Sequence, residues 1–316
     1  MAIAFVFPGQ GSQAVGMGRD MALAFPAAKA VFDEVDAALG QKLSAIMWEG
    51  PQETLTLTEN AQPALMAHSL AVMRVLEAEH GLELASQVKF VAGHSLGEYS
   101  ALAAAGAFTI GDAARLLKLR GQSMQKAVPV GVGAMTALLG VGLDVARLIA
   151  ADAAQGDVCD IANDNEPTQV VLSGHKTAID RVAEVGKKHG LRRAIGLPVS
   201  APFHCSLLKP AADAMAEALT KVDVRRPVVP VIANVLAAPI SDPAEIKRRL
   251  VEQVTGTVRW RECVLAMAAA GVTTLVEVGS GKVLSGLAGR IDKGLKAQAA
   301  GTPADLAAVV AVLSAG

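Results

Sequence analysis

The segment G-H-S-L-G at 93–97 fits the pattern G-x-S-x-G, in which the serine can act as a nucleophile. An apolar, β-prone run at 88–92 precedes it, and a helix-favouring run at 96–105 follows it. A sharp strand-to-helix turn holds the serine hydroxyl clear of the backbone, and the two glycines let that turn form without clashes. The amide of Leu96 would then lie at a helix N-terminus, where it can stabilise an oxyanion. The pattern therefore predicts that Ser95 is a catalytic nucleophile.

A nucleophilic serine needs a base within hydrogen-bond reach. Four of the six histidines fall in or beside helical patterns and are expected to be structural or at the surface: His68, His80, His175 and His189. His94 lies in the turn itself, where sequence neighbours rarely face one another. His204 follows a proline-interrupted stretch and should border a cleft. It is the candidate base, and an ordinary loop histidine is the alternative.

The segment F-P-G-Q-G-S-Q at 7–13 is a glycine-rich loop after the first β-prone run. One interpretation is a dinucleotide site, since Gly9-x-Gly11-x-x-Ala14 satisfies the relaxed Rossmann pattern. That fold needs a second strand ending in an acid about 20 positions later, whereas the acids at 33–36 lie in a helical pattern. A second interpretation is that the N–H of Gln10 completes an oxyanion hole. A simple turn is the third.

Arg120 lies in the helical run 111–124 that follows the serine turn. A guanidinium grips a carboxylate through two parallel hydrogen bonds, so this arginine would suit a substrate that carries a carboxylate. The alternative is a solvated arginine on a helix face, where most arginines lie.

Short β-prone runs alternate with longer helical patterns, which predicts an α/β fold with a mainly parallel sheet. The expected buried strands are 3–7, 88–92, 228–233 and 273–278. From about 130 to 200 the order becomes strand, helix, strand, strand, helix, strand, which is typical of ferredoxin-like folds. We therefore expect a large domain at 1–129 and 200–316, with a small domain inserted at 130–199. Ligands commonly bind in the cleft between two such units.

Within the small domain, strands are expected at 134–141, 158–163, 169–173 and 192–198, and helices at 144–154 and 176–189. Asp164 and Glu166 fall in a polar turn at 163–168, so we expect both to be solvated and not to bind a metal.

The bulk composition excludes several classes of protein. The chain has 316 residues, of which 52% are hydrophobic, enough for a large core. Because 29 basic residues balance 30 acidic ones, no overall charge favours nucleic acid or a membrane surface. The three cysteines lack metal-ligand spacing, and no apolar run is long enough to span a bilayer. The run at 3–7 lacks the flanks of a signal peptide, so we expect a cytoplasmic protein.

Six motifs then occur in order: F-P-G-Q-G-S-Q at 7–13, G-H-S-L-G-E-Y-S-A-L at 93–102, R-G-Q-S-M-Q at 120–125, Q-V-V-L-S-G-H at 169–175, P-F-H-C at 202–205 and E-V-G-S-G-K-V-L at 277–284. Together they resemble the malonyl-CoA:acyl carrier protein transacylases of bacterial fatty acid synthesis. The resemblance runs from about residue 3 to past 290, nearly the whole chain.

This resemblance implies an α/β-hydrolase-like large domain, a ferredoxin-like insert and a ping-pong reaction without a cofactor. Ser95 would attack the malonyl thioester while His204 takes its proton, and the amides of Gln10 and Leu96 would hold the oxyanion. CoA would leave, and the phosphopantetheine thiol of acyl carrier protein would attack the malonyl-serine ester. In this family a main-chain carbonyl, by alignment that of Gln253, orients the histidine.

The resemblance also implies the residues of the acyl pocket. Arg120 matches the arginine that pairs with the malonyl carboxylate, Met124 lines the pocket, and Asn165 falls near the site. Phe203, directly before the histidine, resembles the malonyl-selective members, whereas methylmalonyl-selective relatives tend to have serine there. The segment N-D-N-E-P-T at 163–168 departs from the family, because it has two acids where relatives are usually neutral.

Two other activities would use the same serine and histidine. A stand-alone acyltransferase could load the carrier protein of a polyketide synthase or a malonate decarboxylase. A serine thioesterase would use water as the acceptor and needs a triad acid. Asp160 or Asp180 could be proposed for that role, but neither follows a recognisable strand of the large domain.

Overall fold

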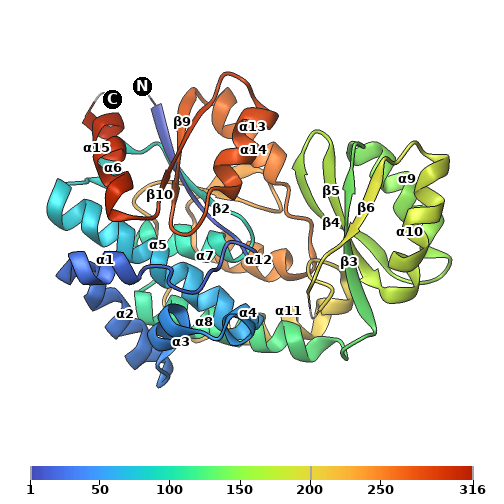
Figure 1. The fold of residues 1–316 in the computed structure, drawn as a ribbon, viewed down its shortest axis with the longest axis horizontal. Helices are drawn as coiled ribbons and strands as arrows, with labels where there is room; N and C mark the ends of the chain where they lie inside the picture. Colours follow the sequence, from blue (N-terminus) through green and yellow to red (C-terminus); the bar gives the residue numbers. More distant parts are fainter. Residues whose placement is uncertain (1, 200, 315–316) are drawn as a thin grey trace.

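The computed structural model describes residues 2–199 and 201–314, in which the strands form two sheets that lie side by side (Figure 1). The strands of the larger sheet are β1 (Ala2–Phe7), β2 (Phe90–Gly93), β7 (Val231–Ala233), β8 (Ala238–Ile240), β9 (Val272–Val278) and β10 (Lys296–Ala300). Those of the smaller sheet are β3 (Gly133–Leu139), β4 (Cys159–Glu166), β5 (Gln169–His175) and β6 (Arg193–Gly196). Ser200, where the predicted large domain resumes, lies outside the described residues.

Helices cover both sheets. They are α1 (Arg19–Ala24), α2 (Pro26–Leu39), α3 (Leu43–Glu49), α4 (Gln52–Thr56), α5 (Thr58–His80), α6 (Leu84–Gln87), α7 (Leu96–Ala104), α8 (Ile110–Ala127), α9 (Leu143–Ala154), α10 (Lys176–Lys188), α11 (Lys209–Thr220), α12 (Pro243–Thr255), α13 (Trp260–Ala269), α14 (Val283–Ile291) and α15 (Leu306–Ser314), with short 3-10 turns at Ser206–Leu208 and Pro303–Asp305. Among the described helices, none combines the length and apolar character that a membrane crossing requires.

The larger sheet has the strand order β10-β9-β1-β2-β7-β8, and its neighbours pair in parallel except β7 and β8 at one edge. This confirms the predicted α/β fold with a mainly parallel sheet. Phe7, the last residue of β1, pairs with Gly93, the last residue of β2. Because parallel strands end at the same edge of a sheet, the glycine-rich loop after β1 and the serine turn after β2 are brought together.

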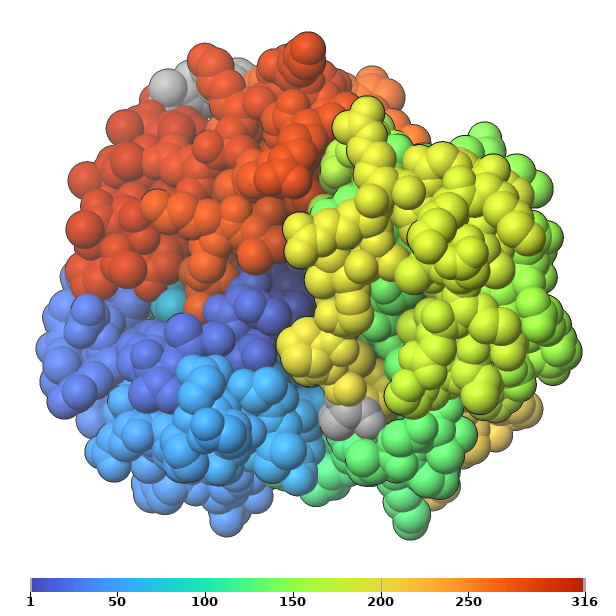
Figure 2. Space-filling view, turned by 45° about the vertical axis from the view of Figure 1, so that its right-hand side comes forward, coloured from blue at the N-terminus to red at the C-terminus, as the bar shows by residue number. Residues whose placement is uncertain are grey.

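The smaller sheet has the order β4-β5-β3-β6, and its pairs are antiparallel. Its strands and the helices α9 and α10 follow the strand–helix–strand–strand–helix–strand order expected for this part of the chain. Figure 2 shows this unit, in green and yellow, packed against the blue and orange parts of the chain.

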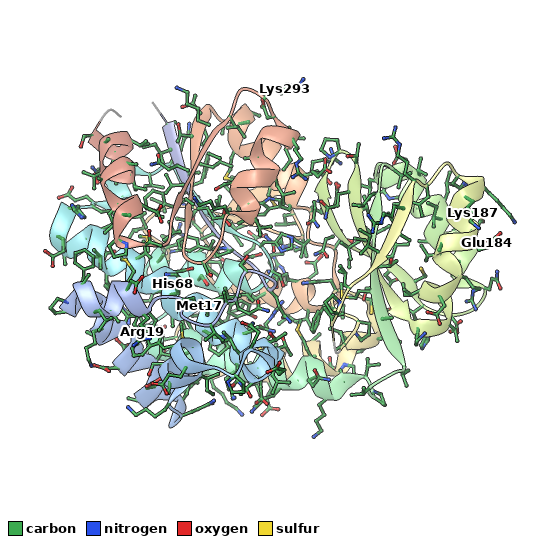
Figure 3. The ribbon with its side chains drawn as sticks, in the orientation of Figure 1. Met17, Arg19, His68, Glu184, Lys187 and Lys293 are labelled. Atoms are coloured by element: carbon green, nitrogen blue, oxygen red, sulfur yellow. The ribbon has the colours of Figure 1, made fainter. Side chains whose placement is uncertain are left out.

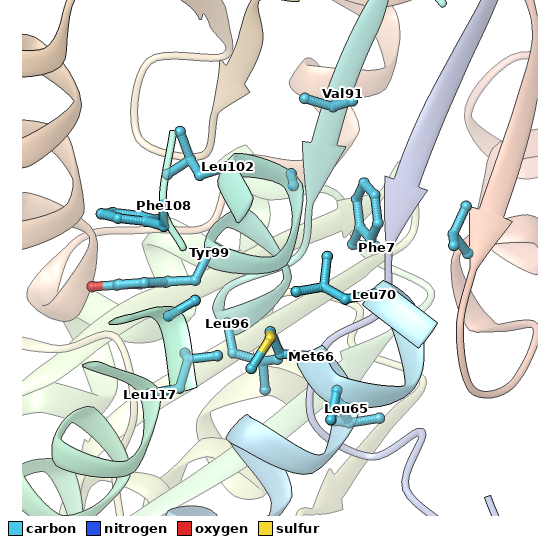
Figure 4. Packing of buried hydrophobic residues seen from close by; sticks show 14 of the residues in the cluster. Phe7, Leu65, Met66, Leu70, Val91, Leu96, Tyr99, Leu102, Phe108 and Leu117 are labelled. Carbon is cyan, nitrogen blue, oxygen red and sulfur yellow. The ribbon is translucent and has the colours of Figure 1, made fainter. Parts of the chain in front are cut away.

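The apolar core packs against the serine turn from the side of the larger sheet. Side chains of β1 alternate between two apolar clusters, because successive residues of a strand point to opposite faces. On the face covered by α5 and α7, Figure 4 shows Phe7 and Leu70 packed near Leu96 and Tyr99. The N-terminal turn of α7 is therefore held by apolar contacts on the side facing the sheet.

Two strands of the larger sheet were not predicted, and one is shorter than expected. β8 has three residues and β10 has the sequence K-A-Q-A-A, so neither carries the β-branched pattern that signals a strand. The run predicted as a strand at 228–233 forms one only from Val231, since Pro230 has no N–H to donate to a ladder.

The prediction of a polar turn at 163–168 is wrong. Residues 163–166 continue β4, and the turn is confined to Pro167 and Thr168. The backbone N–H of Asp164 donates to the carbonyl of Val258 at 3.0 Å. Pairing with this distant segment, which no local pattern reveals, keeps the chain extended.

The expected solvation of the two acids in this segment is also wrong. Asp164 is 1% exposed, and its Oδ2 lies 2.7 Å from Nη2 of Arg261. Glu166 is buried as well and accepts a hydrogen bond from the N–H of Thr168 at 3.2 Å. The ion pair joins β4 to α13 and so ties the smaller sheet to the rest of the chain.

Candidate active site

Ser95 stands in a sharp turn between β2 and α7. Its φ of 54° and ψ of −109° are unusual for a residue with a side chain and typical of a serine held on a strand-to-helix turn. A Cβ added to Gly93 would lie 1.9 Å from the backbone of Gly97, and one added to Gly97 would lie 2.2 Å from the carbonyl oxygen of Phe7. Glycine is therefore required at both positions because backbone fills the space.

We expect Gly97→Ala to destabilise the protein, since its Cβ would push α7 away from the end of β1. Overpacking against backbone places the loss of unfolding free energy at about 2–4 kcal/mol. Gly286→Ala in α14 is the matched control, because nothing lies within 4 Å of the added Cβ. Urea unfolding of both variants measures the difference. Equal stability would show that the turn tolerates a side chain.

His204 lies beside the serine. Its Nε2 is 2.7 Å from Oγ of Ser95, and its Nδ1 is 2.8 Å from the main-chain carbonyl oxygen of Gln253. Because a carbonyl only accepts, Nδ1 carries the proton and Nε2 is free to accept one from the serine hydroxyl. The arrangement can remove a proton from a nucleophile without a triad carboxylate.

Burial, together with the nearby charge of Arg120, lowers the pKa of His204 to about 3. Both effects disfavour the charged imidazolium, while the bond to the carbonyl of Gln253 favours it. The imidazole is therefore neutral, and able to act as a base, throughout the physiological pH range.

This shift predicts the pH dependence of serine acylation. A histidine protonates below its pKa, so a free imidazole with the ordinary value of 6.5 would halve the rate at that pH, whereas His204 stays neutral down to about 3. We expect the single-turnover acylation rate to show no acid limb near pH 6.5. Rapid-quench measurements from about pH 5 to 8 test this. Glu98 is a second buried group near the site, and burial raises its pKa to about 7, so Glu98→Gln removes its titration from the profile. A half-loss near pH 6.5 that persists in Glu98→Gln would contradict a buried, neutral His204.

Arg120 lies buried on α8, and its guanidinium reaches the hydroxyl of Ser95. Only 1% of it is exposed, so the solvated alternative is wrong. Its Nη1 donates to Oε1 of Gln62 at 2.8 Å, and its Nη2 donates to Oε1 of Gln253 at 2.9 Å and to Oγ of Ser95 at 3.1 Å. These three partners are neutral, so a buried positive charge faces the nucleophile. An anionic group bound there would balance it.

A cavity of about 370 Å³ opens beside these groups. Predicted residues that line it are Gln10, Ser95, Leu96, Arg120, Met124, Phe203 and His204. Met135 and Leu197, at and just after strands of the smaller sheet, close the other side. The cavity therefore lies between the two sheets, with the serine, the histidine and the arginine in its wall.

The loop after β1 lies against the serine turn. A Cβ on Gly9 would be 2.8 Å from the carbonyl oxygen of His94, so only glycine allows this approach. Oε1 of Gln10 accepts a hydrogen bond from the hydroxyl of Thr58 at 2.9 Å. On the far side, the hydroxyl of Ser280 donates to the carbonyl of Ser12 at 2.6 Å. These contacts hold the loop beside Ser95. The role of the Gln10 amide in binding the oxyanion stays a prediction.

Asn165 stands one step away from the cavity. Its Oδ1 lies 2.9 Å from Nε2 of His94, and His94 lines the cavity. Asn163, two residues earlier in β4, lines the cavity itself. Asn165 therefore contacts a residue of the cavity wall, and a role for Asn165 in binding substrate stays a prediction.

The other histidines lie elsewhere. His68 is buried on α5, and its Nε2 is 2.9 Å from the carbonyl oxygen of Gly301 (Figure 3). Nδ1 of His175 accepts from the N–H of Val158 at 2.9 Å, and His189 pairs with a surface carboxylate. None of these three lines the cavity among the described residues.

Three buried polar residues around the site were not predicted: Gln62, Glu98 and Asn234. Oδ1 of Asn234 accepts from the N–H of Ser95 at 2.8 Å, and its Nδ2 donates to the carbonyl of Gly93 at 2.7 Å. Burial raises the pKa of Glu98 to about 7 against the opposing effect of its hydrogen bonds. Glu98 is the one charged residue of the helical run 96–105, a signal that could have been used, whereas Gln62 follows polar residues at 58–60 and carries no such signal.

Comparisons with known proteins agree on one family. Residues 4–309 match the family model described as acyl transferase domain. The malonyl CoA-acyl carrier protein transacylase of Escherichia coli strain K12 is 47% identical over 309 residues, which are 97% of this chain and 98% of the relative.

Solved structures agree as well. The acyl-carrier-protein S-malonyltransferase from Bartonella henselae superposes with a TM-score of 0.97 at 54% identity, covering 99% of this chain and all of that one. A malonyl-transacylase in complex with a holo type II PKS acyl-carrier protein has a TM-score of 0.95 at 41% identity, covering 99% and 100%.

Proposed function

The chain belongs to the malonyl-CoA:acyl carrier protein transacylases of the acyl transferase family, and on that premise we propose that it moves a malonyl group from malonyl-CoA to the phosphopantetheine thiol of acyl carrier protein. The observation that carries the substrate assignment is the guanidinium of Arg120, buried, bonded to neutral groups and 3.1 Å from the hydroxyl of Ser95. A malonyl group places a carboxylate near its thioester carbonyl, where this charge can bind it.

In the first half-reaction, Ser95 Oγ attacks the thioester carbonyl while Nε2 of His204 takes the hydroxyl proton. The amides of Gln10 and Leu96 donate to the oxyanion, which forms at the N-terminus of α7. The carbonyl of Gln253 stabilises the imidazolium through Nδ1–H. Collapse of the tetrahedral intermediate expels the CoA thiolate, which takes the proton from His204 and leaves malonyl-Ser95.

In the second half-reaction, the thiol of the carrier protein loses its proton to Nε2 of His204 and attacks the serine ester. The same amides hold the oxyanion. Ser95 then leaves with the proton that His204 returns, so each half-reaction begins and ends with a neutral histidine. Arg120 holds the malonyl carboxylate throughout, and Met124 and Phe203 border the acyl group. No cofactor is needed, because proton transfer and a covalent ester suffice.

The domain division is part of this proposal. We assign 1–129 and 200–316 to an α/β-hydrolase-like catalytic unit and 130–199 to a ferredoxin-like insert. The strand order β4-β5-β3-β6 and the two helices between strands support the insert assignment. Cytoplasmic location follows as a proposal from the fatty acid synthesis role of this family.

A thioesterase would need a carboxylate on Nδ1 of His204, and that position is taken by the carbonyl of Gln253 at 2.8 Å. Asp160 accepts from the N–H and hydroxyl of Ser206 at 2.8 and 2.9 Å, and Asp180 pairs with Lys176 at the surface. The bonded partners therefore favour transfer over triad hydrolysis.

The test of transfer is the fate of the acyl-enzyme. The malonyl-enzyme is separated from malonyl-CoA and split into two samples. One sample is kept in buffer, and the other is mixed with holo acyl carrier protein. We expect the adduct to persist in buffer and to pass to the carrier protein, as followed by intact mass. Equal loss in both would show hydrolysis. Parallel assays with holo carrier proteins of a polyketide synthase and a malonate decarboxylase test the alternative acceptors.

A further inference from the structure

The side chain of Gln253 has one fixed orientation. Its Nε2 donates to Oε2 of Glu98 at 2.8 Å and to the carbonyl of Ser95 at 3.0 Å, and lies 3.2 Å from Oδ1 of Asn234. Three acceptors around one atom identify that atom as the amide nitrogen. Its Oε1 therefore faces the other way and accepts from Nη2 of Arg120 at 2.9 Å.

The contact with Glu98 is the shortest of the three, and Glu98 does not line the cavity. It lies in the first turn of α7, is 1% exposed, and its Oε2 also accepts from the backbone N–H of Asn234 at 2.9 Å. One amide thus stands between the carboxyl group of Glu98 and the guanidinium of Arg120.

We propose that Glu98 is a positioning residue for the malonyl carboxylate: it holds the amide of Gln253 so that Oε1 faces Arg120, and thereby aims the guanidinium at the acyl group on Ser95. This inference rests on the proposed function. A reversed amide would present its NH₂ to a guanidinium that can only donate, and its oxygen to Glu98 and to a backbone carbonyl. Each such buried mismatch is unfavourable.

The same glutamine links the two halves of the chemistry. Its main-chain carbonyl orients His204, and its side chain orients Arg120. Loss of the Glu98 contact should free only the side chain, because the main-chain carbonyl belongs to α12. The expected signature is a loss of discrimination between malonyl and acetyl groups, with the transfer of acetyl nearly retained.

Two variants separate reach from charge. Glu98→Gln keeps an oxygen at the same distance, which can accept both existing hydrogen bonds, but it cannot ionise. Glu98→Asp keeps an ionisable carboxyl group but is one methylene shorter, so its oxygens fall short of Gln253. The matched control is Glu277→Asp, which shortens another fully buried carboxylate, one that accepts from the N–H groups of Leu284 and Ser285 in the first turn of α14.

The experiment measures kcat/KM for acylation of Ser95 by malonyl-CoA and by acetyl-CoA in the full-length protein. We expect Glu98→Asp to lower the malonyl-to-acetyl ratio about tenfold, and Glu98→Gln to keep it within about threefold of the unmodified protein. Glu277→Asp should lower the melting temperature without changing the ratio.

An unchanged ratio in Glu98→Asp would overturn the inference, and so would a loss in Glu98→Gln as large as in Glu98→Asp, since charge would then matter more than reach. Failure of the unmodified protein to form malonyl-Ser95 would instead refute the proposed function, so the two failures are distinguishable.

Discussion

Replacement of Arg120 by alanine is expected to lower malonyl transfer by about 100- to 1,000-fold and acetyl transfer by far less. Arg120 is 1% exposed, and its hydrogen-bond partners among the described residues are neutral side chains, so a malonyl carboxylate gains a charge-assisted contact with a buried guanidinium. Acetyl offers no partner to that charge. Removing the arginine therefore removes a large favourable interaction from malonyl transfer. In acetyl transfer it removes a buried charge that has no partner.

Initial rates with malonyl-CoA and acetyl-CoA, each titrated to give kcat/KM, measure this effect. Arg115→Ala is the control, because Arg115 lies on the same helix and is bonded to Asp112 at the surface. It should leave both rates unchanged. Equal losses for the two acyl groups in Arg120→Ala would assign Arg120 to stability or to the serine, not to the carboxylate.

Replacement of His204 by alanine is expected to slow acylation of Ser95 by about 100- to 10,000-fold, the range of general acid–base catalysis. The hydroxyl loses the acceptor that lies 2.7 Å away, and in the described structure Arg120 then remains as its neighbour and can only donate. Binding of malonyl-CoA should be little affected, since the carboxylate contact is made by the arginine.

Rapid-quench acylation gives the rate, and binding to the Ser95→Ala/His204→Ala double variant gives the affinity. His189→Ala, which removes a surface histidine of the smaller unit, should behave like the unmodified protein. An acylation rate in His204→Ala within tenfold of the original would show that another group takes the proton.

The serine turn could be predicted because its determinants are local. Two glycines, a preceding apolar run and a following helical run specify a strand, a turn and a helix without reference to distant residues. The proximity of His204 could be inferred only from a proline-interrupted loop, because the pairing of Phe7 with Gly93 and the packing of α12 decide what meets Ser95.

Properties set by distant partners could not be predicted. The burial of Arg120 depends on Gln62 and Gln253 from two other helices, and a solvated arginine has the same local pattern. The polar sequence around Asp164 predicts a solvated turn, because the ion-pair partner Arg261 lies 97 positions away and leaves no local signal. In each case the local composition is polar and predicts exposure, whereas contacts with distant residues bury the side chain.

The role of Gln253 shows a further limit. A main-chain carbonyl is present in every residue, so no residue type marks the one that orients the histidine. The resemblance to the family indicates the position, and the distance of 2.8 Å to Nδ1 of His204 is consistent with it.

The most direct test of Ser95 as a temporary carrier of malonate is a competition among acyl donors. The protein is incubated with equal concentrations of malonyl-, methylmalonyl- and acetyl-CoA, and the adduct is identified by intact mass and peptide mapping. A persistent malonyl ester on Ser95, outnumbering the other two and absent from Ser95→Ala, is the predicted result. CoA release without an adduct, or an acetyl or methylmalonyl ester in excess of malonyl, would contradict it.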